Sequence, residues 1–193
     1  MKFHKRQMSN PLFNQKLVQA MASQYGLRLG AVWLCSFACT MYALDVPFLG
    51  TLGNFLGLFS IVMGARMIRT YRIQEHDLSW PQSLWFALTF FLFAALLTTL
   101  GQYIYFAFID KGHFLHIISS FFDNPLYAES MKQSFPELDV NLLLETFASM
   151  SSKDIIMQFL FMNLMATGAC ALLSSLFGGL GKLPVQPENK ITE

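Results

Sequence analysis

The chain has 193 residues, of which 54% are hydrophobic and only 13% are charged, and its formal net charge is +1. A soluble globular domain carries roughly 25% charged residues. The composition therefore excludes an ordinary soluble protein and indicates an integral membrane protein.

Four segments are long and apolar enough to be membrane-spanning helices. Backbone polar groups in hydrocarbon must be satisfied within each segment, and the short alternating strands of a membrane barrel are not seen. The predicted fold is all-α, with residues 1–193 forming a single membrane domain. Within it we expect a four-helix transmembrane bundle with spans at about residues 26–44, 47–67, 82–109 and 155–180.

The third span is the longest, because no charged side chain occurs between Asp77 and Asp110. At about 1.5 Å per residue its apolar part reaches about 39 Å, against a hydrocarbon thickness of about 30 Å. We therefore expect this helix to continue beyond the bilayer.

The distribution of charge predicts the orientation. Lys and Arg gather in the N-terminal tail, in the connection after the second span and in the C-terminal tail. Residues 110–154 instead carry more acidic than basic side chains: Lys111, Lys132 and Lys153 against Asp110, Asp123, Glu129, Glu137, Asp139, Glu145 and Asp154. Because positive charge favours the cytoplasmic side, we expect both termini to be cytoplasmic and the loop 110–154 to lie outside.

The loop 110–154 is not a simple linker. Its apolar residues recur at helical spacing, with breaks at Pro125 and Pro136 and with Asp139 as the expected cap of the last helix. We predict two or three short amphipathic helices that lie on the outer leaflet or fold over the bundle. A small exposed cap that binds a partner is the alternative.

Small residues at regular spacing indicate close contacts between helices. They form one row on the second span and two on the fourth: Gly50, Gly53, Gly57, Ser60 and Gly64, then Thr167, Ala171, Ser175 and Gly179 beside Ala166, Cys170, Ser174 and Gly178. The contacts can lie within one bundle or between subunits. The expected partners are therefore the lipid bilayer and, through these faces, a second copy or another membrane protein, with no indication of nucleic-acid binding.

Three side-chain amides fall at a similar depth in the predicted bundle. Counted from the outer ends of their helices, Asn54, Gln102 and Asn163 lie roughly 10–14 Å below the outer boundary. Amides in hydrocarbon seek partners, so we predict a shared hydrogen-bonded layer. The layer is either a packing contact between helices or the floor of an outward-facing polar cavity.

The residues give little sign of catalysis. Asp110, His113 and His116 follow one another at three-residue steps and form the candidate set for a divalent metal, but histidines at a membrane interface commonly contact headgroups instead. Neither an HExxH nor a GxSxG motif nor a phosphate-binding glycine loop is present. We therefore expect no enzymatic activity, no cofactor and no metal.

Three blocks of sequence resemble bacterial membrane proteins of domain of unknown function family 4199: MASQYGLRLGAVWL, FLGLFSIVMGARMIRTYR and LGQYIYFAFIDKG. The resemblance covers roughly Gln24 to Leu180. It implies a four-span protein of the bacterial cytoplasmic (inner) membrane and supplies no activity, cofactor or catalytic residue. The expected function is that of a non-enzymatic structural or interaction subunit. A small transporter or channel with a path lined by Asn54, Gln102 and Asn163 is the alternative.

Overall fold

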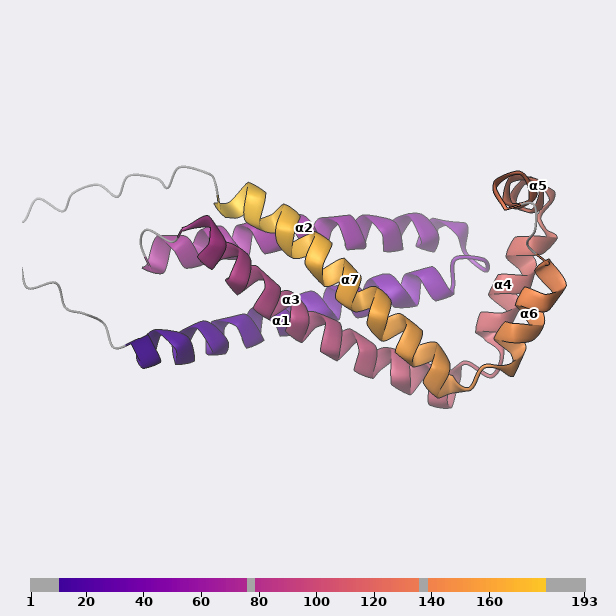
Figure 1. Cartoon of the computed structure of the whole chain (residues 1–193), viewed down its shortest axis with the longest axis horizontal. Coiled ribbons are helices and arrows are strands. Elements are labelled where there is room, and N and C mark those ends of the chain that lie inside the picture. Colours follow the sequence, from indigo (N-terminus) through magenta and orange to yellow (C-terminus); the bar gives the residue numbers. More distant parts are fainter. Residues whose placement is uncertain (1–10, 76–78, 136–138, 180–193) are drawn as a thin grey trace, which may run out of the picture.

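The computed structural model describes residues 11–75, 79–135 and 139–179, and the regular structure within these ranges is helical, without a strand. The all-α prediction is confirmed for this part of the chain. The elements, drawn in Figure 1, are α1 (Pro11–Met41), α2 (Pro47–Glu75), α3 (Trp80–Ile104), the π-helical turn η1 (Tyr105–Ile109), α4 (His113–Asp123), α5 (Pro125–Ser134), α6 (Val140–Ser149) and α7 (Ser152–Gly179).

Three of the helices are long and apolar enough to cross a membrane, which indicates a membrane protein. They are Pro47–Ile73, Trp80–Ile109 and Ser152–Gly179. Each contains nearly all of one predicted span, at 47–67, 82–109 and 155–180. Residue 180, the predicted end of the last span, lies outside the described ranges.

The first predicted span, 26–44, is not among these three helices, and the helix that contains most of it has different ends. The helix begins much earlier, at Pro11, and ends at Met41 in a turn in which the Val46 amide donates to the Tyr42 carbonyl. The exposed Arg28 lies within α1, and the apolar stretch that follows it, up to Met41, is shorter than the roughly 20 residues that a spanning helix needs.

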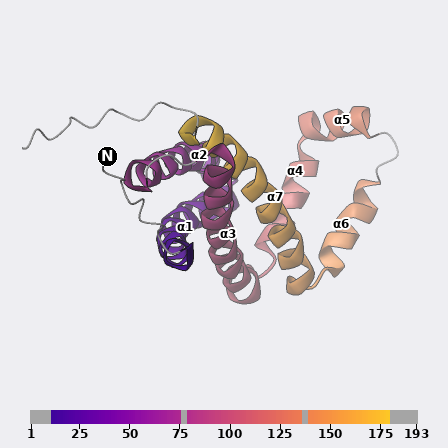
Figure 2. The same ribbon diagram turned by 60° about the vertical axis from the view of Figure 1, so that its left-hand side comes forward.

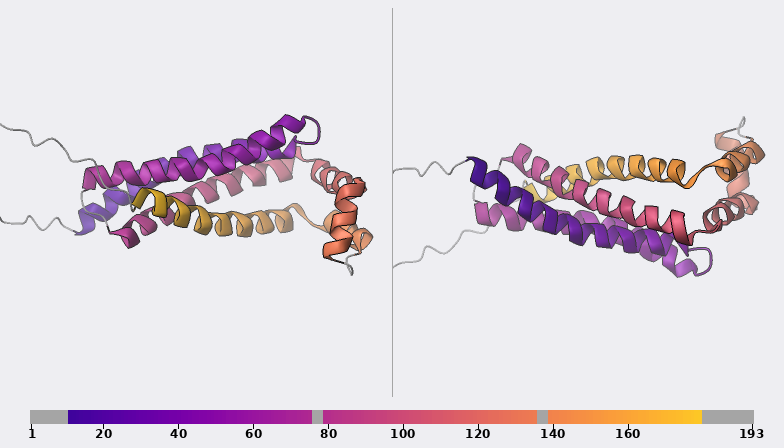
Figure 3. Two further views of the ribbon diagram at one scale, coloured as in Figure 1. Left: turned by 90° about the horizontal axis from the view of Figure 1, so that it is seen from above. Right: turned by 90° about the horizontal axis from the view of Figure 1, so that it is seen from below.

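The four long helices form a bundle in which each packs against two neighbours. α1 packs against α3 and α2, and α7 packs against the same two helices. The start of α1 and the end of α7 lie at one end of the bundle, which we call the terminal end. The opposite end, where α4–α6 follow, is the loop end (Figures 1 and 3).

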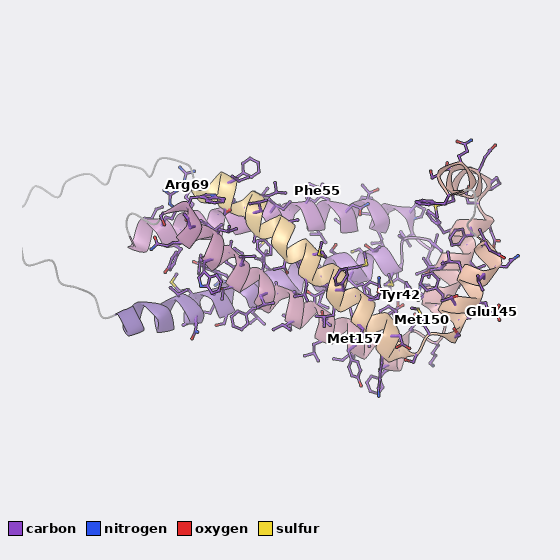
Figure 4. All side chains as sticks on the ribbon, in the orientation of Figure 1. Tyr42, Phe55, Arg69, Glu145, Met150 and Met157 are labelled. Atoms are coloured by element: carbon purple, nitrogen blue, oxygen red, sulfur yellow. The ribbon has the colours of Figure 1, made fainter. Side chains whose placement is uncertain are left out.

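The core of the bundle is built on aromatic side chains of α3. Phe86, Phe90 and Phe91 are fully buried, and Tyr71 of α2 stacks on Phe86 with ring centroids 4.1 Å apart. Many other large apolar side chains of the long helices point outward, as Phe55 does in Figure 4. An apolar exterior around an apolar core is the arrangement that lipid requires.

The small residues of α2 and α7 bring helices together within this chain. A side chain added at Gly53 of α2 would lie 3.0 Å from the Ser36 carbonyl oxygen of α1. One added at Gly178 of α7 would lie 2.5 Å from the Ala65 carbonyl oxygen of α2. Gly168, which no predicted row contains, has open space around it. The predicted rows therefore have a role in packing the single bundle.

The segment between η1 and α7 holds three helices that lie beyond the loop end (Figures 1 and 2). Gly112, with φ at +89°, allows the sharp turn into α4, and the Asp110 carboxylate accepts hydrogen bonds from the Gly112 and Phe114 amides. Asp139 accepts hydrogen bonds from the Asn141 and Leu142 amides, so its predicted role as a cap is confirmed.

Candidate functional site

A polar contact between α3 and α7 lies inside the bundle. The Asn163 side-chain nitrogen donates to Gln102 Oε1 and to Thr99 Oγ1, each over 2.9 Å. Gln102 is only 3% exposed. The Thr167 hydroxyl, one turn further along α7, donates to the Asn163 carbonyl at 2.9 Å. Two of the three predicted amides are therefore brought together.

Asn54 does not join them, which corrects the predicted three-residue layer. The depth estimate placed Asn54 level with the other two amides, but depth does not fix the direction of a side chain. Gly53 and Gly57 are among the residues of α2 that face α1, and Asn54 follows Gly53 by a rotation of about 100° around the helix. Its side chain is consequently exposed on the outside of the bundle.

The two paired amides line a cavity of about 240 Å³ to which all four long helices contribute. The space is an open pocket rather than an enclosed void. No charged side chain lines it. The lining residues are Trp33, Ser36, Phe37, Gly57, Thr98, Gln102, Asn163, Ala166 and Cys170.

Aromatic rings lie across the loop end of this cavity. Phe106, one turn beyond Gln102 on the chain, and Phe159, one turn before Asn163, have ring centroids 5.2 Å apart. Phe37 of α1 lies 5.8 Å from Phe159 and 6.0 Å from Phe106. Phe106 is buried. These three rings, which we call the aromatic cluster, separate the cavity from the α4–α6 segment.

The opposite side of the cavity is closed by the core. The Trp33 ring lies 5.8 Å from that of Phe91, which is fully buried. The Thr98 hydroxyl donates to the Ala94 carbonyl of its own helix at 2.8 Å, so this polar group is satisfied locally. The cavity is therefore bounded along the bundle axis in both directions.

The candidate metal ligands Asp110, His113 and His116 do not converge on one site. Asp110 caps α4, and His113 Nε2 donates to the Met41 carbonyl oxygen at 2.9 Å while its ring lies 5.4 Å from that of Tyr42. His116 is exposed. No group of three potential metal ligands occurs among the residues that the structure describes.

The sequence prediction missed several cavity residues. Thr99 is one turn before Gln102 on the same face of α3, and this spacing was a usable signal for a third member of the polar contact. Trp33 and Phe37 were not predicted, because nothing in an apolar helix distinguishes a ring that lines a cavity from one that faces lipid.

The whole cavity falls within a match to a known family. The model of the family described as "Protein of unknown function (DUF4199)" matches residues 24–180. The chain belongs to the DUF4199 family. The match extends from α1 to residue 180, just past α7, so it also includes the α4–α6 segment. No curated protein and no solved structure matches the chain. Membership of the DUF4199 family assigns no activity to the cavity or to the α4–α6 segment.

Proposed function

We propose that this chain is a non-enzymatic interaction protein of the bacterial cytoplasmic membrane, with four spanning helices, which binds a partner protein at its α4–α6 segment. The observation that carries the proposal is an apolar groove between α4 and α6 that no other part of the described chain fills.

The proposed four-span topology rests on the packing of α1. This helix lies between α2 and α3 in the bundle, so it crosses the bilayer if they do. Arg28 is exposed, and its long side chain can reach the headgroup region while its stem lies in hydrocarbon. Arg66 and Arg69 lie towards the terminal end of α2, which supports a cytoplasmic location for that end and an external one for α4–α6.

The groove has the size and composition of a binding site. Its volume is about 390 Å³, and its lining is entirely apolar: Ile117, Ile118, Phe121, Phe122, Leu143 and Phe147. Ligand pockets commonly measure about 300–1,000 Å³. Neither α4 nor α6 has a buried residue. An uncovered apolar groove on a segment outside the membrane supports a role in association.

The charge around the groove indicates the kind of partner. Asp123 at the end of α4 and Glu145 on α6 are exposed, and the surrounding loop has an excess of acidic residues. A partner helix with apolar residues at helical spacing and flanking Lys or Arg is complementary to such a surface. The same acidic charge would weaken binding to an anionic lipid surface.

Site-specific photo-crosslinking in intact cells tests the proposal. A photoreactive residue is placed at Ile118 or Leu143, inside the groove, and at the exposed Glu129 on α5 as the matched control. We expect a discrete protein adduct from both groove positions and none from the control. Asp123→Lys should weaken the adduct. Lipid adducts alone at 118 and 143, or equal protein adducts at all three positions, would contradict the proposal.

The transporter alternative has less support. The predicted path needs Asn54, which lies on the outside of the bundle, and the aromatic cluster lies across the loop end of the cavity. Both features count against a continuous polar route along the bundle.

A further inference from the structure

The cavity between the long helices has hydrogen-bonding capacity that the protein does not use. The side-chain nitrogen of Asn163 donates hydrogen bonds to both Thr99 Oγ1 and Gln102 Oε1. The side-chain NH₂ of Gln102 and the side-chain oxygen of Asn163 have no hydrogen bond to any described residue. If the nitrogen and oxygen positions were exchanged in both amides, the Asn163 NH₂ group and the Gln102 carbonyl oxygen would be the groups left without a hydrogen bond. The cavity therefore offers a donor and an acceptor next to each other.

These groups lie between the long helices, where Gln102 is buried and Asn163 is half-buried. Only 3% of the Gln102 surface is exposed. The aromatic cluster bounds the cavity at the loop end, and Trp33 and Phe91 bound it on the opposite side. In a bilayer, an amide group without a hydrogen-bond partner is unfavourable, so a ligand that supplies one gains affinity. The volume of about 240 Å³ far exceeds the roughly 30 Å³ that one water occupies.

The way into the cavity lies between α2 and α7. These two helices are in close contact towards the terminal end, where the Ser174 hydroxyl donates to the Ile61 carbonyl at 3.0 Å. Towards the loop end they diverge, as Figures 1 and 3 show, and α2 stays on α1 through the Ser36–Gly53 hydrogen bond of 2.7 Å. The cavity residues at this divergence are Gly57 and the exposed Ala166, neither of which is large enough to block it.

We propose that this cavity binds the polar end of an uncharged acylglycerol, whose acyl chain leaves between α2 and α7 into the bilayer. The ester carbonyl of the ligand accepts from the Gln102 amide, and a glycerol hydroxyl donates to Asn163. A charged headgroup is excluded because no lining residue carries a compensating charge. A quinone offers acceptors only and leaves the Asn163 oxygen unsatisfied. The proposal rests on the membrane location of the bundle and is independent of any partner at α4–α6.

The test uses the purified full-length chain in phosphatidylcholine nanodiscs. A monoacylglycerol with a photoactivatable group close to the ester is added, and adducts are mapped by mass spectrometry. We expect them between Trp33 and Phe37 on α1 and between Asn163 and Cys170 on α7. Unlabelled monoolein should compete, whereas oleic acid and a short-chain quinone should not.

Two variants on α7 separate the cavity from the general lipid surface. Ala166→Phe fills the entrance and should abolish these adducts. Ala169→Phe, also exposed but not part of the lining, should leave them unchanged. Gln102→Leu removes one hydrogen bond and should weaken competition by monoolein about three- to tenfold.

Three results would overturn the proposal. The first is labelling that persists in Ala166→Phe, because the adducts would then come from the outer surface. The second is equal competition by oleic acid or by the quinone, because the donor and acceptor would then not select the ligand. The third is an absence of adducts at α1 and α7 in the unmodified chain.

Discussion

Gln102 on α3 and Asn163 on α7 are joined by a 2.9 Å hydrogen bond inside the bundle, although 61 positions separate them in the sequence. In hydrocarbon an amide has no water to bond with, so each of these side chains depends on the other. This dependence gives the contact a measurable effect on stability.

A double-mutant cycle measures the contact directly. We expect Gln102→Leu and Asn163→Leu each to destabilise the bundle, with a coupling energy of about 0.6–2 kcal/mol between them. Asn54→Leu is the control and should leave the unfolding free energy unchanged or raise it, because Asn54 is exposed on the outside of the bundle. The measurement is denaturant-induced unfolding in mild detergent micelles. Additive effects of the two changes would show that the amides act independently.

The same three amides show how far sequence reasoning reached. Depth along a helix follows from counting residues, and it placed Gln102 and Asn163 at a common level. The direction in which a side chain points depends on which face of its helix packs against the neighbouring helices. In a mostly apolar helix, the sequence has little polar and apolar periodicity from which that face can be predicted. For α2 the glycine row was the better guide, because Gly53 and Gly64 mark the side that packs on other helices. Asn54 lies off that row.

Some helix boundaries could be predicted from the sequence and others could not. The segments that begin or end at Pro47, Ile109 and Ser152 were predicted within a few residues, because proline and charge define them. α1 was not, since its polar first half has no feature that separates a helix from a tail. The cavity was beyond prediction altogether, because it results from the divergence of α2 and α7 towards the loop end.

Two glycines on α7 predict opposite effects of one added methyl group. Gly178→Ala places a carbon 2.5 Å from the Ala65 carbonyl oxygen, which forces α2 and α7 apart, and we expect a loss of about 1–3 kcal/mol. Gly168→Ala meets nothing within 4 Å and should stabilise the helix by up to about 1 kcal/mol. Thermal unfolding of both variants in the same detergent checks the prediction. Equal effects would mean that Gly178 is not at a close helix contact.

Two histidines on α4 provide another matched pair. His113 donates to the Met41 carbonyl and packs on Tyr42, so it ties the start of α4 to the turn between α1 and α2. His113→Ala should weaken this attachment by about 0.5–1.5 kcal/mol and increase hydrogen exchange across His113–Asp123. His116→Ala should have no such effect, because the His116 side chain is exposed. Unchanged exchange in His113→Ala would place the attachment of α4 elsewhere.

The number of membrane crossings can be decided by labelling single cysteines in intact cells, after Cys35, Cys39 and Cys170 are replaced by serine. With four spans, Glu145→Cys on α6 and Asp45→Cys in the turn between α1 and α2 should react with a membrane-impermeant maleimide. Both side chains are exposed, and the turn between α1 and α2 and the helix α6 lie at the loop end.

A cysteine placed ahead of α1 and one replacing the exposed Arg69 should react only after the membrane is permeabilised, because the basic terminal end faces the cytoplasm in the proposed topology. The position ahead of α1 is the decisive one. If it reacts in intact cells while Arg69→Cys does not, α1 does not cross the bilayer. The three helices that meet the length and apolarity requirement would then be the only spans among the described residues, and the packing of α1 along α3 would have to form outside the hydrocarbon.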